Sequence, residues 1–166
     1  CPNMRKRVIY IDIIHIKRVL RQLQLTESQH LSPVDHGMHE NILVQMEASD
    51  IIVGYNTYIA LVKDLIKDKE VVGNGMRQEV DRCQKAVDLA VEGNKVAVVS
   101  SGDPGVYGMA GLVLELIQKV DAQKRPECIV IPGLTAANTS AAASGAPLMH
   151  DYAVISLSDL MTPWNQ

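Results

Sequence analysis

The sequence lacks the features that define several classes of protein. No uninterrupted apolar run approaches the roughly 20 residues that a membrane-spanning helix needs. The net charge is −3, whereas a general nucleic-acid binder needs a basic face to neutralise phosphates. The three cysteines are odd in number and form no CxxC pair, so they indicate reduced thiols rather than a disulfide framework. We therefore expect a cytoplasmic protein that binds neither nucleic acid nor membrane.

Signals for export, for phosphate and for metal are also weak or missing. The basic start "MRKRVIYIDIIHIKRVL" is like that of a signal peptide, but Asp12 and His15 interrupt its apolar part, so we set that interpretation aside. No GxxxxGKS or GxxxxGKT loop is found, and no GxGxxG turn follows the first regular strand. His36 and His39 have HxxH spacing. Without further ligands they indicate the solvent-facing start of a helix, and no metal site is predicted.

From about residue 50 the chain alternates between short apolar strands and amphipathic helices. Its 166 residues are enough for one well-filled domain. Strands are expected at 50–55, 95–101, 127–131 and 152–158, and helices at 56–66, 78–94, 107–120 and 134–145. This alternation predicts an α/β fold with an open, mainly parallel sheet flanked by helices.

Two local details of this pattern can be tested. The basic N-terminal part leaves residues 8–14 open between strand and helix, while residues 19–25 favour a helix. The helix at 78–94 is expected to bury one apolar face and to stop at Gly93. The residues expected on that face are Val80, Cys83, Val87, Leu89 and Val91.

Three loops rich in glycine or serine are expected at one edge of the sheet. They are residues 100–108, 132–135 and 157–159, each directly after a predicted strand. Ligands of open α/β sheets bind outside the carboxyl ends of the strands, and glycine lets the backbone approach them closely. Asp103 makes the first loop unfavourable for phosphate, and an acidic, glycine-lined pocket suits a cationic small molecule. S-adenosylmethionine fits these terms, although the chemistry alone does not select it.

Several segments resemble one enzyme family. "SSGDPGVYGMAGL" (100–112) resembles the GDPxxYG signature of the tetrapyrrole methylases, which use S-adenosylmethionine. "GNGMRQEVDR", "PGLTAANTSAAASGAPL" and "HDYAVISLSDLMTPW" are similar to its precorrin-3B and cobalt-precorrin-3B C17-methyltransferases, which act in vitamin B12 synthesis. The similarity extends from about Glu40 to the end. It implies a tetrapyrrole substrate, a homodimer, and a cofactor bound in a cleft between two domains.

The resemblance also implies which residues contact the ligands. The residues implied at the cofactor are Ser100, Ser101, Gly102, Asp103, Val106, Tyr107, Thr135 and Ala136. The substrate has many carboxylates, for which Arg77 and Arg82 are available. Arg82 could instead pair with Gln78 or Glu79 on its own helix.

No catalytic triad is expected, because methyl transfer mainly needs the methyl group to be aligned with a nucleophilic carbon. The C17 branch also contracts the macrocycle, a step that should need general acid–base help. By residue type the candidates are Asp103, His150 and Asp159.

The first 40 residues depart from the family pattern. The family begins with a GxGPG-type turn, whereas the matching region "HLSPVDHGMHENIL" keeps only Pro33, Asp35 and Gly37. We therefore expect an atypical N-terminal segment at 1–39, a cofactor-binding domain at 40–157, and the start of a linker to a second domain at 158–166. A fragment, a gene remnant or a damaged reading frame would each explain such a chain.

Two other functions stay open at this point. A truncated domain of the family could bind the cofactor or dimerise without catalysing methyl transfer. An unrelated α/β enzyme with a nucleotide cofactor, such as a nicotinamide-dependent reductase, would need a GxGxxG turn that the sequence lacks. The motifs do not distinguish a metal-free corrin substrate from one that contains cobalt.

Overall fold

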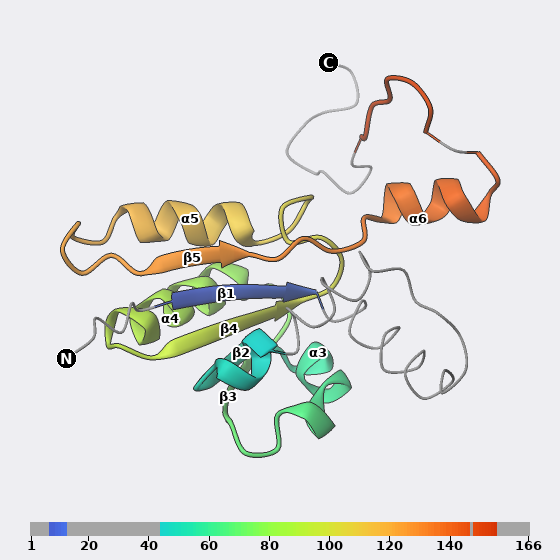
Figure 1. The fold of residues 1–166 in the computed structure, drawn as a ribbon. Helices are drawn as coiled ribbons and strands as arrows, with labels where there is room; N and C mark the ends of the chain where they lie inside the picture. The colour runs from blue at the N-terminus through green and yellow to red at the C-terminus, as the bar shows by residue number, and fades with distance from the viewer. Residues whose placement is uncertain (1–6, 13–43, 147, 156–166) are drawn as a thin grey trace. The chain divides into compact units, whose positions relative to one another are not determined.

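The computed structural model describes residues 7–12, 44–146 and 148–155 (Figure 1). The chain divides into two compact units, Cys1–Leu134 and Thr135–Gln166. Several sequence predictions lie outside the described residues: the histidine pair at 36 and 39, the altered first loop at 30–43, the 157–159 loop and Asp159.

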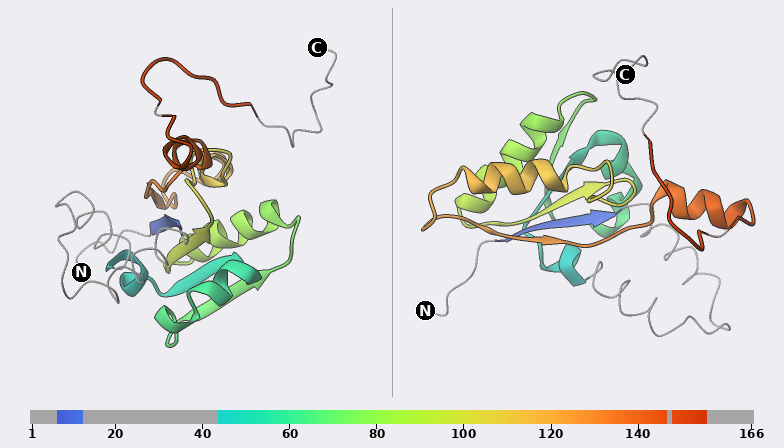
Figure 2. Two further views of the ribbon diagram at one scale, coloured as in Figure 1. Left: turned by 90° about the vertical axis from the view of Figure 1, so that its right-hand side faces the viewer. Right: turned by 90° about the horizontal axis from the view of Figure 1, so that it is seen from above.

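The first unit is built on five parallel strands in the order β3-β2-β4-β1-β5. The strands are β1 (Arg7–Asp12), β2 (Ile51–Tyr55), β3 (Glu70–Asn74), β4 (Lys95–Ser100) and β5 (Glu127–Val130). Figure 2 shows β1 between β4 and β5, where Tyr10 pairs with Val98 and Val130. This sheet confirms the predicted open, parallel α/β fold.

Helices cover both faces of this sheet. Helices α4 (Glu79–Val91) and α5 (Ala110–Gln118) pack on one face, together with Val96 and Val98 of β4. The short helix at 44–48, α3 (Asn56–Leu61) and the 3-10 turn η1 (Lys63–Leu65) bring Met46, Val62 and Ile66 against Ala97 and Val99 on the other face.

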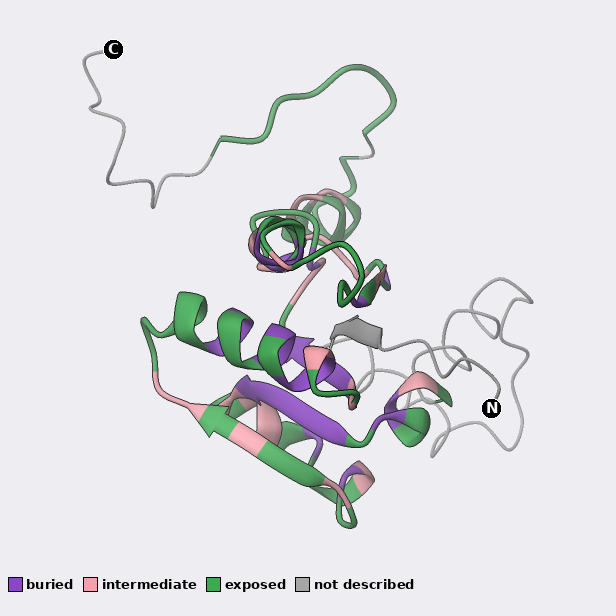
Figure 3. Ribbon diagram, turned by 90° about the vertical axis from the view of Figure 1, so that its left-hand side faces the viewer, coloured by how far each residue is buried: buried purple, intermediate pink, exposed green. Residues whose placement is uncertain are grey.

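Alternate residues of β4 therefore enter two different cores, which explains why this strand reads as a continuous apolar run. Figure 3 shows the buried residues concentrated on β2, β4 and the helix faces turned toward them.

Two close approaches of backbone hold α3 on its face of the sheet. A Cβ on Gly54 would overlap the side chain of Val99 and would lie 3.2 Å from the side chain of Ile59 in α3, and one on Gly73 would overlap the side chain of Asn56. Glycine at these strand positions lets the N-terminal end of α3 lie directly against β2 and β3.

The structure corrects several predicted boundaries. β3 was not predicted, because as an edge strand it is largely exposed and has no apolar run. The open alternative for 8–14 resolves to a strand over its described part, residues 8–12. The helix expected at 56–66 is interrupted at Val62, and the strand expected from residue 152 is not formed over 152–155.

Two predictions about helix ends and faces also change. The helix expected from Tyr107 begins at Ala110, because Tyr107 has a left-handed φ of 51°. Val80, expected to be buried, is 59% exposed. The buried stripe of α4 runs through Cys83, Ala86 and Ala90, and Val80 lies roughly a quarter turn away from it. Gly93 has a positive φ just after α4 and ends it as predicted.

The second unit contains α6 (Ala136–Ala143), the predicted helix of small residues. Thr135 caps it, since its hydroxyl oxygen accepts a hydrogen bond from the backbone N–H of Asn138 at 3.2 Å. None of the residues in α6 is buried. Residues 151–155 follow without regular secondary structure.

Candidate functional site

The carboxyl ends of the five strands share one edge of the sheet because all the strands are parallel. The loop at 101–109 leaves this edge after β4, and the loop at 131–134 leaves it after β5 (Figure 1). Two of the three predicted loops thus lie at the expected edge, which is where open α/β sheets bind ligands.

The carboxylate of Asp103 connects these two loops. Its Oδ1 accepts a hydrogen bond from the backbone N–H of Gly105 at 2.7 Å, and its Oδ2 accepts one from Gly133 at 3.1 Å. Gly102, just before it, has a φ of +81°, a conformation that favours glycine. Both carboxylate oxygens of Asp103 thus accept hydrogen bonds from backbone N–H groups, as expected of a residue that fixes the conformation of a loop.

The remainder of the 101–109 loop folds back on itself. The N–H of Ala110 donates to the carbonyl of Pro104 at 3.0 Å, and a Cβ on Gly108 would overlap the backbone of that same proline. Val106 and Tyr107 are at the tip, and Tyr107 is 70% exposed. The loop therefore has a defined conformation and presents two side chains to solvent.

The serines at the start of the loop differ in environment. Ser100 is 5% exposed, and within the described part of the chain its Oγ has no hydrogen-bond partner. Ser101 is exposed. A buried hydroxyl without a partner is costly, and the predicted contact of Ser100 with a ligand stays a prediction.

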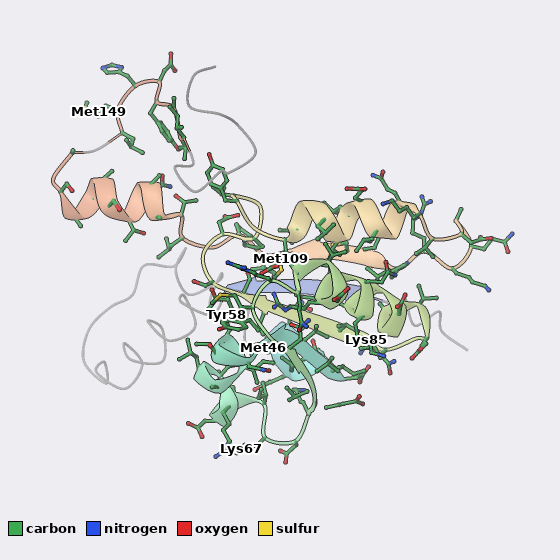
Figure 4. The ribbon with its side chains drawn as sticks, turned by 180° about the vertical axis from the view of Figure 1, so that it is seen from behind. Met46, Tyr58, Lys67, Lys85, Met109 and Met149 are labelled. Carbon is green, nitrogen blue, oxygen red and sulfur yellow. The ribbon has the colours of Figure 1, made fainter. Side chains whose placement is uncertain are left out.

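Thr135 and Ala136, also predicted at the cofactor, belong to the second unit. There Thr135 caps α6, and Ala136 is its first residue. His150 is exposed in the segment that follows α6, next to Met149, which Figure 4 labels. Their predicted contacts with ligands stay predictions.

The two arginines predicted to bind substrate carboxylates differ from each other. Arg77 is exposed and has a left-handed φ of 63°. Arg82 is buried, and its side chain binds Asn74, Gly75 and Met109. The alternative of a side-chain pair with Gln78 or Glu79 is wrong, because the guanidinium points back toward the end of β3. The side chain of Arg82 is therefore buried between the turn after β3 and the end of the 101–109 loop, and it does not lie on an exposed surface.

Sequence reasoning gave no role at this edge to Asn74 or Met109, and it placed Gly133 in a predicted loop without naming its partner. The contacts of Met109 with Arg82 and of Gly133 with Asp103 join segments that are distant in the sequence. The one local signal was "GNGMRQ", where glycines flank Asn74 and predict a turn.

No group of three or more potential metal ligands occurs among the residues that the structure describes. Cys83 is buried, and burial raises the pKa of the Cys128 thiol to about 11, so this thiol stays protonated at neutral pH. No helix in the described ranges is long and apolar enough to cross a membrane.

Comparisons with known proteins agree with this geometry. Residues 44–166 match the tetrapyrrole (corrin/porphyrin) methylases. A probable cobalt-factor III C(17)-methyltransferase of Salmonella typhimurium is 54% identical over 121 residues, which are 72% of this chain and 48% of that protein. A precorrin-3B C(17)-methyltransferase of a Sinorhizobium species is 44% identical over 118 residues, which are 70% of this chain and 46% of that protein. The chain spans about half the length of these relatives.

Solved structures share the fold. The crystal structure of the methyltransferase CobJ has a TM-score of 0.69 and 30% identity, and the match covers 96% of this chain and 58% of that chain. A uroporphyrin-III-C-methyltransferase from Thermus thermophilus has a TM-score of 0.53 at 22% identity, covering 88% of this chain and 55% of that chain. The sequence match over most of the chain, the parallel sheet and the GDPGVYG loop at its carboxyl edge lead to one conclusion: this chain belongs to the tetrapyrrole (corrin/porphyrin) methylase family.

Proposed function

We propose that this chain forms the cofactor-binding part of an S-adenosylmethionine-dependent C-methyltransferase of cobalamin biosynthesis. Its substrate is a corrin-pathway tetrapyrrole, which the enzyme methylates at C17 with contraction of the ring. The observation that carries the proposal is the 54% identity to a probable cobalt-factor III C(17)-methyltransferase over a segment that includes the GDPGVYG loop. We include in the proposal a homodimer and a cytoplasmic location.

The carboxyl edge of the sheet fits the cofactor in three respects. The buried Ser100 hydroxyl has hydrogen-bonding capacity left over for a ligand. Glycines at 102, 105 and 108 let the loop backbone approach a bound molecule. The exposed Tyr107 ring provides a flat apolar surface at the loop tip. A related Thermus thermophilus enzyme, 18% identical with a TM-score of 0.51, was solved as a complex with S-adenyl homocysteine.

In this proposal the residues of the chain mainly bind and orient. S-adenosylmethionine, when bound, supplies the activated methyl group. Ser100, Ser101, Gly102, Val106 and Tyr107 contact the cofactor. Asp103 holds the two loops together, which would help to keep a bound cofactor in one orientation for the transfer.

Substrate contacts and proton transfer fall to exposed side chains. Arg77 is exposed, and its guanidinium is suited to bind a substrate carboxylate. His150 is the described candidate for acid–base help in ring contraction, while Asp159 remains a candidate outside the described residues. Asp103 is disfavoured for this role, because both its oxygens accept backbone N–H groups.

Calorimetric titration of S-adenosylhomocysteine into the full chain tests the proposal. Asp103→Ala should weaken binding about tenfold or more, since two loop hydrogen bonds are lost. The matched control is Asp121→Ala. Asp121 also accepts a backbone N–H two residues ahead, from Gln123 at 2.8 Å, but in the loop before β5 at the opposite edge of the sheet.

Four results are informative. Binding that only Asp103→Ala weakens supports the proposal and justifies a methyl-transfer assay. Equal affinity in both variants would contradict the position of the cofactor at this loop. No binding by a chain shown to be folded would contradict cofactor binding by this chain. Binding without methyl transfer would favour the non-catalytic alternative.

A further inference from the structure

Arg82 is a buried cation in the first turn of α4, with 4% of its surface exposed. Its Nε donates to Asn74 Oδ1 at 2.6 Å, its Nη2 to the carbonyl of Gly75 at 3.0 Å, and its Nη1 to Met109 Sδ at 3.4 Å. The guanidinium carbon lies 5.9 Å from the centroid of the Tyr55 ring. Among the described residues no carboxylate lies within ion-pair distance of it. Neutral acceptors and an aromatic ring therefore compensate this buried charge.

The partners of Arg82 come from three different parts of the sheet edge. Tyr55 is the last residue of β2, Asn74 is the last residue of β3, and Met109 is the residue just before α5. Figure 4 labels Met109. Met109 ends the same loop in which Asp103 and Tyr107 lie. Because a guanidinium donates in a rigid planar fork, Arg82 fixes the end of this loop relative to the ends of two strands.

The turn after β3 is fixed at its other side as well. The side-chain oxygen of Gln78 accepts from the N–H of Gly75 at 3.0 Å, and the side chain of Asn74 donates to the carbonyl of Gln78 at 3.1 Å. Within this turn Arg77 has its left-handed φ. The exposed Arg77 turn and the 101–109 loop thus share one buried connection, the side chain of Arg82.

We propose that Arg82 is a positioning residue for the 101–109 loop, that it acts through Met109, and that it does not contact the substrate. The proposal deepens the proposed function and rests on it, because the loop is the one that would receive S-adenosylmethionine. It also extends the site to Asn74, Met109 and Tyr55, three residues without an assigned role.

Amide hydrogen exchange of the full chain, followed by NMR, tests the positioning role without any ligand. The reporters are the N–H of Val106, which donates to Asp103, and that of Ala110, which donates to Pro104. The variants are Arg82→Met, which removes all the donors, Met109→Leu, which removes the sulfur acceptor at similar volume, and the double variant. Lys85→Met, at an exposed position of α4 (Figure 4), is the matched control.

Both single variants should accelerate exchange at the two reporters about tenfold, while the β4 amides keep the rates of the wild-type protein. The double variant should exchange no faster than Arg82→Met, because the two side chains act through one contact. Arg82→Lys should recover part of the protection. Lys85→Met should change nothing.

Two results would overturn the proposal. One is wild-type exchange at both reporters in Met109→Leu. The other is an acceleration in Met109→Leu that is equal in the loop and in β4, as expected of a residue that only supports the core. If Arg82→Met does not fold, Met109→Leu and Arg82→Lys still decide between these outcomes.

A separate measurement tests the proposed function. Titration of the wild-type chain with S-adenosylhomocysteine tests cofactor binding, whereas loop exchange tests positioning. If the wild-type chain does not bind, the proposed function fails and the exchange result still stands. If it binds, Met109→Leu should weaken the affinity several-fold, and an unchanged affinity would overturn the link between positioning and binding.

Discussion

At the scale of single residues, two glycines three positions apart have opposite requirements. Gly108 closes the loop after β4, and a Cβ there would overlap the backbone of Pro104. Gly111 lies in the first turn of α5, and a Cβ there would meet nothing within 4 Å. The first position needs the absence of a side chain, whereas the second does not.

This contrast predicts opposite effects of one substitution. Gly108→Ala should lower the free energy of unfolding by about 1–3 kcal/mol, because backbone must shift to accept the methyl group. Gly111→Ala should raise it by about 0.5–1 kcal/mol through helix propensity. Urea denaturation of both variants measures these changes, and equal effects at the two positions would contradict the loop packing.

Cys128 gives a prediction about reactivity. Burial raises the pKa of its thiol from 9.0 to about 11, so at pH 8 only about one molecule in a thousand carries the thiolate that reacts. In a Cys1→Ser variant, thiol titration with a disulfide reagent at pH 8 should be slow in the native chain and fast in denaturant. Fast native modification would show that β5 is more open than described.

The same shift has a defined sign for stability. The folded chain holds the proton on Cys128 up to about pH 11, whereas the unfolded chain releases it near pH 9. Its contribution is therefore fully present below about pH 9 and is lost as the pH rises toward 11. Cys128→Ser should reduce this alkaline loss of stability in urea unfolding measured between pH 8 and 11.

At the scale of secondary-structure elements, β4 has five of its six residues buried, and α4 has one face against it. Val98 is fully buried in the core between the sheet and α4, whereas Val80 is exposed on the first turn of that helix. Truncating each of these two valines to alanine separates the contribution of core packing to stability from that of helix propensity.

Val98→Ala should therefore destabilise the fold by roughly 2 kcal/mol, from lost apolar burial and the cavity left behind. Val80→Ala should be neutral or slightly stabilising, because alanine is the better helix former and no packing is lost. Thermal denaturation followed by circular dichroism compares the two. A large loss at Val80 would show that a partner covers this face of α4.

The elements that the sequence predicts well are those with strong local signals. β2, β4 and β5 stand out as short apolar runs bounded by turns, and α4 has its apolar stripe and terminal Gly93. β3 has no such signal, since an edge strand needs little apolar surface. The start of α5 was predicted three residues too early, because nothing in "VYGM" indicates that Tyr107 takes a left-handed conformation.

The candidate site shows the same division. The GDPGVYG loop and its place at the carboxyl edge follow from local pattern and strand order. The partners of Asp103 and Arg82 do not, because Gly133 and Met109 approach them only in the folded chain. An aspartate in a glycine-rich loop therefore reads as a candidate catalyst in the sequence, whereas its hydrogen bonds make it a connection between loops.

At the scale of the whole molecule, a ligand that binds only the folded state must stabilise all of it. S-adenosylhomocysteine at about one hundred times its dissociation constant should add about 2.7 kcal/mol to the free energy of unfolding. For a chain of this size this corresponds to a rise of about 5–10 °C in the melting temperature. Differential scanning calorimetry measures it, and a constant melting temperature at saturating ligand would contradict binding to the native state.

The two compact units and the expected domain boundaries are different divisions of the chain. The contacts divide it after Leu134, whereas the family resemblance places boundaries at 39/40 and 157/158. We keep the latter as a proposal about the complete enzyme. Expression of residues 44–166 alone tests the boundary at 39/40, because this segment lacks β1. If β1 is essential, the segment should not form the native sheet.

The place of β1 also determines when the protein can finish folding. This strand begins at Arg7, but the two strands that enclose it begin at Lys95 and Glu127. During synthesis β1 therefore leaves the ribosome long before either neighbour exists, while β2, β3 and α4 can already associate. Such distant pairing slows folding because a long loop must close before the contacts form. The sheet is thus completed only when β5, the last of the five described strands to be made, pairs with β1, the first.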